Sequence, residues 1–228
     1  MEAQLQVPAG LEGCNPHGAK LQIYQEGGRS EWMQYSAVKM FTNAFVINTA
    51  KQQMLLGYKK RGFATGVYNG FGGKVDIGET SLEAAHRELK EEAGIEASLE
   101  HCGVLFFYQE GHQYAHFIDI YRADSWTGEP TETDEMKPQW FQIPSLSGSL
   151  VNLAEDLAKT EQGGSETSHT TIPLHRMWKD DVLWYPLLLS KRRFIGRVDL
   201  VEAPSTPEPL DPSAPLHPLV KWWFATID

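Results

Sequence analysis

The segment from Thr80 to Gly94 constrains this chain most, because it predicts a helix whose two ends are both specified. Thr80 can cap the first turn, and Glu83 three residues later completes a capping box. Gly94 stands where helices commonly end. We therefore expect a helix from Ser81 to Ala93. Apolar residues recur along it at helical spacing and form the expected core stripe: Leu82, Ala85, Leu89 and Ala93.

The same helix carries an unusual group of acids. Glu88, Glu91 and Glu92 are spaced i, i+3 and i+4, so one helix face presents three carboxylates. Glu91 and Glu92 also lie near the helix C-terminus, where the macrodipole disfavours negative charge. Either this face is simply solvated, or a divalent cation neutralises it. Carboxylate oxygens are hard ligands that suit Mg²⁺, with Mn²⁺ as an alternative.

A glycine-rich stretch before the helix favours the metal interpretation. Gly72 and Gly73 allow the backbone to approach a metal or phosphate closely. Arg87 is spaced to pair with Glu79 through two hydrogen bonds and so to hold this loop on the helix. An acidic surface helix alone would not require a glycine loop and an arginine at fixed distances.

The full spacing, G-x5-E-x7-R-E-apolar-x-E-E-x-G-apolar, resembles the signature of the Nudix hydrolase family. The resemblance implies an α/β (α+β) fold, an α/β/α sandwich with a central mixed sheet, and hydrolysis of a nucleoside diphosphate derivative with Mg²⁺. It also implies that Glu88, Glu91 and Glu92 hold the metal with the Gly72 carbonyl, and it leaves open which glutamate activates water. The matching positions are Gly73, Glu79, Arg87, Glu88, Leu89, Glu91, Glu92, Gly94 and Ile95.

Further segments within residues 41–200 resemble the animal MutT-homologue group of this family, which hydrolyses oxidised purine nucleoside triphosphates. The resemblance implies conversion of 8-oxo-dGTP, with 2-hydroxy-dATP as a further candidate, to the monophosphate and pyrophosphate, which sanitises the nucleotide pool. It makes Glu135 a metal or water ligand and Lys59 a pocket residue. The segments that carry it are 57–63, 69–74, 134–136, 140–141, 177–181 and 184–189.

The residues themselves agree with a purine pocket. Asp180 and Asp181 are adjacent acids, and in a desolvated pocket both cannot ionise easily, so one can donate while the other accepts. Trp178 offers a ring for stacking on a base, and Asn69 can both donate and accept. Alternatively, the two acids only start a helix and Asn69 only forms a turn. The other residues expected to bind substrate are Lys59, Phe71, Gly72, Gly73, Lys74 and Phe107.

Several pocket positions depart from the animal group, which leaves the range of substrates open. A Nudix hydrolase acting on ADP-ribose or a dinucleotide is one alternative, and a nucleotide-binding module without turnover is another. The departing residues are Ala44, Tyr68, Gln109, His116 and Lys179.

The chain divides into three expected parts. Residues 1–38 are expected to be a loosely ordered N-terminal extension, although 21–24 can form a short strand. Residues 39–200 are expected to form the hydrolase domain, with a surface insertion at 145–172 around a short helix at 150–159. Residues 201–228 form a proline-rich tail whose terminal aromatics dock on the domain or a partner. Within the domain we expect strands at 41–47, 54–58, 104–108, 117–121 and 194–200, a further strand within 136–143, and a helix at 181–191.

Composition limits the partners. A net charge of −10 argues against binding nucleic acid polymers. The family resemblance implies a small nucleotide as the ligand, and we expect a monomer. Two distant cysteines fit a reducing compartment. The first residues resemble neither a secretory signal nor a transit peptide, and no apolar run reaches the ~20 residues of a membrane helix. These features predict a cytoplasmic protein, with the nuclear and mitochondrial nucleotide pools left open.

Overall fold

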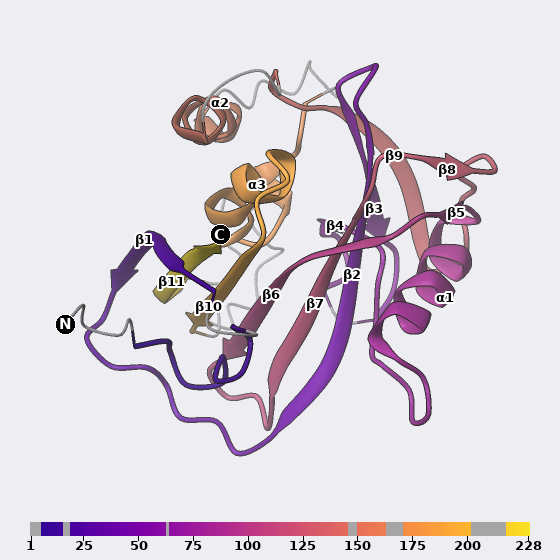
Figure 1. The fold of residues 1–228 in the computed structure, drawn as a ribbon. Helices are drawn as coiled ribbons and strands as arrows, with labels where there is room; N and C mark the ends of the chain where they lie inside the picture. Colours follow the sequence, from indigo (N-terminus) through magenta and orange to yellow (C-terminus); the bar gives the residue numbers. More distant parts are fainter. Residues whose placement is uncertain (1–5, 16–18, 63, 146–149, 163–170, 202–217) are drawn as a thin grey trace, which may run out of the picture.

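A mixed β-sheet organises the computed structural model (Figure 1), which describes residues 6–15, 19–62, 64–145, 150–162, 171–201 and 218–228. The sheet has nine strands in the order β1-β11-β10-β6-β7-β2-β3-β4, with β9 paired to β3. It is mixed because β2 runs parallel to β7, and β10 parallel to β6. The strands are β1 (Leu21–Gly28), β2 (Val38–Asn48), β3 (Gln53–Lys59), β4 (Tyr68–Asn69), β6 (Glu100–Gln109), β7 (Ala115–Ala123), β9 (Met136–Gln142), β10 (Phe194–Leu200) and β11 (Leu219–Ile227).

Helices cover both faces of this sheet (Figure 1). Alternation along β2 shows why: Ala44 and Val46 join the core cluster of α1 (Ser81–Ala93), whereas Phe45 and Ile47 join that of α3 (Asp181–Leu189). The expected α/β/α sandwich with a mixed sheet is confirmed. Two short strands, β5 (Glu96–Ala97) and β8 (Trp126–Thr127), pair separately, and a 3-10 turn spans Leu174–Arg176. No helix in the described part of the chain is long and apolar enough to cross a membrane.

Helix α1 has the predicted bounds and ends. The Thr80 side chain accepts from the Glu83 amide, the Glu83 side chain accepts from the Thr80 amide, and Gly94 ends the helix in the left-handed conformation with φ 73°. The expected core stripe was wrong at Leu82, which is 41% exposed. At that end of the helix the small side chains of Ala84 and Ala85 are buried instead.

The two chain ends differ from expectation, because both join the sheet. Strand β11 lies between β1 and β10, antiparallel to each (Figure 1). Residues 21–28 are therefore not part of a loose extension, and residues 219–227 are not part of a loose tail. Prolines dominate the tail sequence, but its last segment is rich in aromatic and β-branched residues, which favour strands. Its aromatics Trp223 and Phe224 are buried on the chain's own sheet.

The segment expected as a surface insertion contributes to the core. Helix α2 (Leu150–Gln162) packs beside α3, with Leu153 and Leu157 buried. This helix covers the expected short helix at 150–159 and continues beyond it. The insertion's segments 146–149 and 163–170, and the proline-rich segment 202–217, lie outside the described residues.

A buried ion pair fixes the N-terminal segment to the sheet. The Arg197 guanidinium on β10 is fully buried and donates to Asp199 at 2.9 Å, to the Ala9 carbonyl at 2.8 Å and to the Met33 carbonyl at 2.7 Å. The Asp199 carboxylate in turn accepts from the Met33 amide at 2.6 Å. The guanidinium carbon of Arg197 also lies over the face of the Trp32 ring, 4.6 Å from the centroid of that ring. Residues before β2 are therefore tied to strands near the other end of the chain.

Arg197→Met is expected to lower the free energy of unfolding by about 3–5 kcal/mol, because it leaves the Asp199 carboxylate buried without its partner. Urea denaturation of the full chain measures this. The control is Arg192→Met, which removes an exposed pair with Asp228 at 3.8 Å and should cost less than ~1 kcal/mol. Equal destabilisation by the two variants would contradict this role of Arg197.

Candidate active site

The loop between β4 and α1 is held against β2 so closely that only glycine fits. The Thr42 amide donates to the Gly73 carbonyl at 2.9 Å. A Cβ atom added at Gly72 would lie 2.0 Å from the Thr42 carbonyl oxygen, and one added at Gly73 would lie 2.4 Å from Glu88 Oε1. Gly72 therefore lets the loop approach the backbone of β2, and Gly73 lets it approach Glu88 on α1.

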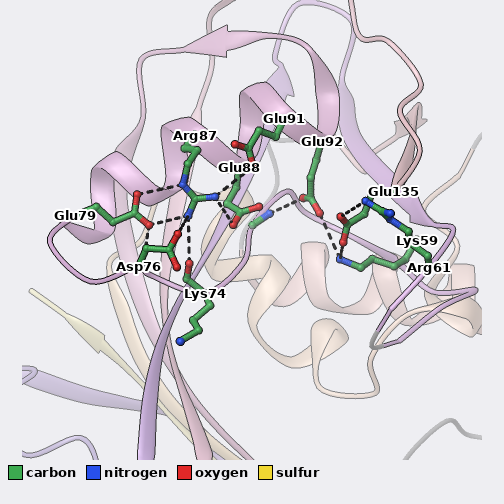
Figure 2. A network of polar contacts seen from close by, with 11 residues as sticks. Lys59, Arg61, Lys74, Asp76, Glu79, Arg87, Glu88, Glu91, Glu92 and Glu135 are labelled. Atoms are coloured by element: carbon green, nitrogen blue, oxygen red, sulfur yellow. Dashed lines mark hydrogen bonds and ion pairs between the residues drawn. The ribbon is translucent and has the colours of Figure 1, made fainter.

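Arg87 holds the loop on the helix in the way predicted. Its guanidinium donates to Glu79 from Nη2 at 2.7 Å and from Nε at 3.2 Å, a bidentate pair (Figure 2). Nη1 donates to Glu88 at 2.8 Å and to Glu91 at 3.3 Å, and Nη2 reaches the Lys74 carbonyl at 3.3 Å. Hydrogen bonds from Arg87 lower the pKa of Glu79, which keeps its carboxylate ionised. One cation thus orients three acids.

Glu92 is the most deeply placed of the three helix acids, at 3% exposure. Its Oε2 accepts from the Gly72 amide at 2.9 Å, and its Oε1 lies 3.4 Å from Lys59 Nζ (Figure 2). Burial outweighs these contacts and raises the pKa of Glu92 to about 7. Lys59 also pairs with Glu135 at 2.9 Å, and these acids raise its pKa against the opposing effect of burial. Arg61 Nη2 lies 3.5 Å from the other carboxylate oxygen of Glu135, so Lys59 and Arg61 together neutralise these acids.

The three helix acids lie on one face of α1 but differ in how deeply they are buried. Among the described residues, no three His, Cys, Asp or Glu side chains lie close enough together to hold a metal ion. Glu91 is 61% exposed and turns to Arg87, whereas Glu92 turns inward to Lys59. Like charges on one helix face repel each other, and here these acids pair with nearby cations. The donor set nevertheless fits a divalent metal, since it consists of carboxylate oxygens beside a glycine backbone. The side-chain cations Arg87, Lys59 and Arg61 pair with these acids or with Glu135.

A pocket opens beside this loop, between the sheet and the start of α3. Its cavity volume is about 220 Å³, somewhat below the ~300–1,000 Å³ typical of small-molecule sites. The structure brings most of the predicted substrate residues together around it: Lys59, Asn69, Gly72, Gly73, Phe107, Trp178, Asp180 and Asp181.

Two predicted substrate residues lie elsewhere. Phe71 is fully buried in the core cluster under α1, on the other face of the sheet from α3. Its backbone pairs with Ala44, which turns its side chain away from the pocket. Lys74 is exposed and does not line the pocket, although its carbonyl accepts from Arg87. Neighbouring positions in an extended loop point to opposite sides, so not all of residues 71–74 can face the ligand.

The acid pair is buried at the floor of the pocket. Asp180 precedes α3, but its side chain makes no capping hydrogen bond; its Oδ2 accepts from Trp184 Nε1 at 3.1 Å instead. Its Oδ1 is buried without a hydrogen-bond partner among the described residues. Asp181 Oδ2 accepts from the Trp178 amide at 3.2 Å. Burial raises the pKa of Asp180 to about 6, and burial with the Asp180 charge raises that of Asp181 well above its ordinary value.

These pKa shifts predict a pH-dependent stability. A carboxyl whose folded pKa exceeds its unfolded value of about 3.8 binds more protons in the folded state, so stability falls as pH rises through that window. The free energy of unfolding should therefore fall from pH 4 through pH 6 and above. In the double variant Asp180→Asn, Asp181→Asn this fall should be much smaller, because amides do not ionise. Urea denaturation of both proteins from pH 4.5 to 8 tests it, and parallel curves would contradict it.

Aromatic rings form the pocket wall. The rings of Phe107 and Trp178 meet edge to face with centroids 5.1 Å apart. His116 on β7 lies 5.7 Å from Phe107 and 4.5 Å from Phe41. Burial, with the His112 and Lys39 charges, lowers the pKa of His116 to about 4, so its ring is neutral at pH 7. The wall suits a flat, uncharged ring system such as a base.

The sequence interpretation missed Asn43, a pocket residue on β2 that is only 8% exposed. The available signal was a polar amide within the otherwise apolar strand from Phe41 to Ile47. Polar side chains are rarely buried without a partner, so an amide in such a run suggests a site.

Comparisons with known proteins agree with this geometry. Residues 40–161 match the NUDIX domain family. The chain is 41% identical over 159 residues to the oxidized purine nucleoside triphosphate hydrolase of Danio rerio, covering 69% of this chain and 84% of that protein. It is 38% identical over 162 residues to the Mus musculus protein of the same name, covering 71% and 86%.

A solved structure supports the fold. The crystal structure of a mutator MutT protein from Bacillus halodurans superposes with a TM-score of 0.53 at 20% identity, covering 82% of this chain and 97% of that one. The loop of glycines, the acids of α1, the arginine that orients them and the mixed sheet beneath them together have one explanation: this chain belongs to the Nudix hydrolase family.

Proposed function

We propose that this chain hydrolyses oxidised purine nucleoside triphosphates, with 8-oxo-dGTP as the main substrate, to the monophosphate and pyrophosphate. The observation that carries the proposal is the buried pair Asp180–Asp181 beside Trp178, in a pocket that reaches the loop of Gly72 and Gly73. The pocket can therefore hold a base at the acid pair while the phosphates lie at the acids of α1. The curated relatives named as oxidized purine nucleoside triphosphate hydrolases support this substrate class.

The residues have separable roles in this reaction. Water adds across the anhydride between the α- and β-phosphates, and one of its protons leaves. Mg²⁺, for which Mn²⁺ can substitute, would be held by Glu88, Glu91 and Glu92, with the Gly72 carbonyl and Glu135; when bound, it neutralises charge on the phosphates and orients the attacking water. Arg87 fixes the loop through Glu79 and positions two of these acids. Lys59 lies between Glu92 and Glu135, where it can pair with a phosphate oxygen.

The acid pair supplies base recognition. Burial and the Asp180 charge raise the pKa of Asp181 well above its ordinary value, which favours the protonated carboxyl that can donate a hydrogen bond. The unpartnered Asp180 Oδ1 can accept one. A base with adjacent donor and acceptor groups satisfies both. Trp178 and Phe107 supply the apolar wall on which the base packs.

A substrate panel tests the proposal. The purified chain with Mg²⁺ is assayed on 8-oxo-dGTP, dGTP and ADP-ribose, with chromatography of the products. We expect kcat/KM for 8-oxo-dGTP to exceed that for dGTP by at least ~10-fold, as follows from one well-placed hydrogen bond at the base edge. Preference for ADP-ribose would indicate another Nudix substrate. No turnover of any compound would indicate a nucleotide-binding module and remove the proposal.

A further inference from the structure

The orientation of two pocket amides is fixed by one backbone group. The Gly70 amide can only donate, and its partner at 2.8 Å is Asn69 Oδ1. That same oxygen lies 2.8 Å from the Asn43 side-chain amide, so the Asn43 atom facing it is the donor Nδ2. Nitrogen and oxygen of an amide are otherwise hard to distinguish, but here the backbone donor decides both.

Because Asn43 Nδ2 faces Asn69, the Asn43 Oδ1 atom points away from Asn69. This oxygen is buried and has no hydrogen-bond partner in the part of the chain that the structure describes. The residue is 8% exposed and lines the pocket. A Cβ atom added at Gly70 would lie 2.2 Å from this oxygen, so the glycine keeps the space that the amide occupies. Buried acceptors without partners are costly, and one at the wall of a ligand pocket is suited to a ligand donor.

We propose that Asn43 is a specificity-determining residue whose Oδ1 accepts a hydrogen bond from the exocyclic amino group of the purine. This inference rests on the proposed function and names the base edge that the site reads. Asn69 Nδ2 donates to the ring nitrogen next to that amino group. The two amides thus present an acceptor beside a donor, which matches an amino group beside an unprotonated ring nitrogen, as at the 2-amino edge of guanine bases.

The surroundings favour a base over a phosphate at this position. Phosphates carry no N–H group, and an acceptor oxygen repels them. The walls beside Asn43 include the apolar side chains of Leu105, Phe107 and Ile118, which suit a flat ring. The acid pair lies on the same face of the sheet: the Phe45 ring, two residues along β2 from Asn43, is 5.6 Å from that of Trp184, which donates to Asp180. One base can therefore meet the amides on one edge and the acids on another.

The test compares two substrates that differ only in the amino group, 8-oxo-dGTP and 8-oxo-dITP, each with wild type and Asn43→Leu. Leucine has the same branched outline but removes the acceptor, and with it the Nδ2 donor to Asn69. We expect the kcat/KM of the variant for 8-oxo-dGTP to fall ~10-fold or more, as one lost buried hydrogen bond allows. For 8-oxo-dITP we expect a clearly smaller loss, limited to the missing support of Asn69, because that substrate lacks the donor. Asn48→Leu, at the far end of the same strand, is the control and should change neither.

The outcomes separate the inference from the function on which it rests. No hydrolysis of either compound by the wild type would remove the proposed function. Wild-type hydrolysis with an equal loss on both substrates in Asn43→Leu would overturn the inference and indicate a contact to the sugar or ring instead. If Asn43→Leu does not fold, Asn43→Ser is measured in the same way. A wild type that does not prefer 8-oxo-dGTP to 8-oxo-dITP also overturns the inference.

Discussion

Glu92→Gln is expected to lower kcat by ~10²–10³-fold or more while the protein remains folded, because it removes one charged group from the centre that neutralises the phosphates. Glu92 is the most buried of the three acids on α1, and it joins the helix to the loop through the Gly72 amide. Glutamine preserves the shape and can still accept from that amide. The charge, and with it the affinity for a divalent cation, is lost.

The stability of the same variant separates chemistry from folding. Burial raises the pKa of Glu92 to about 7, so its charged form is disfavoured in the folded state. Replacing it by a neutral amide should therefore leave the melting temperature at pH 8 unchanged or higher. The matched control is Glu96→Gln, which should keep full activity. Glu96 is an exposed acid just after α1 that pairs with Lys90. More than about a tenth of wild-type activity in Glu92→Gln would contradict the assigned role.

Asp181→Ala is expected to lower kcat/KM for 8-oxo-dGTP ~10-fold or more, since losing the carboxyl leaves its partner on the base buried and unsatisfied, which costs about 1–3 kcal/mol. The loss should appear mainly in KM, because the residue binds the base and lies away from the acids of α1. Activity on a nucleotide whose base the site does not read should change little. Steady-state kinetics of the full chain on 8-oxo-dGTP and ADP-ribose measure the difference.

The control for this variant is Asp119→Ala, a partly buried acid on β7 that pairs with His101 outside the pocket. It removes a less buried carboxylate, 15% exposed at its side chain, without touching the base site. If both variants lose activity equally on both nucleotides, the effect belongs to folding. If Asp181→Ala retains wild-type KM for 8-oxo-dGTP, the acid pair serves only the start of α3.

Elements whose ends are specified by residues within the same segment were predicted correctly from the sequence. Helix α1 has a capping box and a glycine end within one segment, and its bounds agree with the structure. Strand β10 was predicted with the bounds that the structure gives. Arg87 and Glu79 were predicted as partners because their spacing across a loop and helix allows one geometry.

Features that depend on long-range pairing were not predictable in the same way. Strand β11 follows a proline-rich segment and pairs with β1, about two hundred positions away in the sequence, and no local pattern specifies that partner. Phe71 was assigned to the pocket, although the register of the loop against β2 turns it to the other face. Likewise, helical spacing placed three acids on one face but did not give their depths, which depend on Lys59, Arg87 and the sheet below.

A crystal structure of the chain with Mg²⁺ and the product 8-oxo-dGMP tests the central claim most directly. The account predicts metal density between the carboxylates of Glu88 and Glu92 beside Gly72, with the purine against Trp178 and hydrogen-bonded to Asp181. Density for the nucleotide in another place, or the acids of α1 directed to solvent with no ion among them, would contradict it.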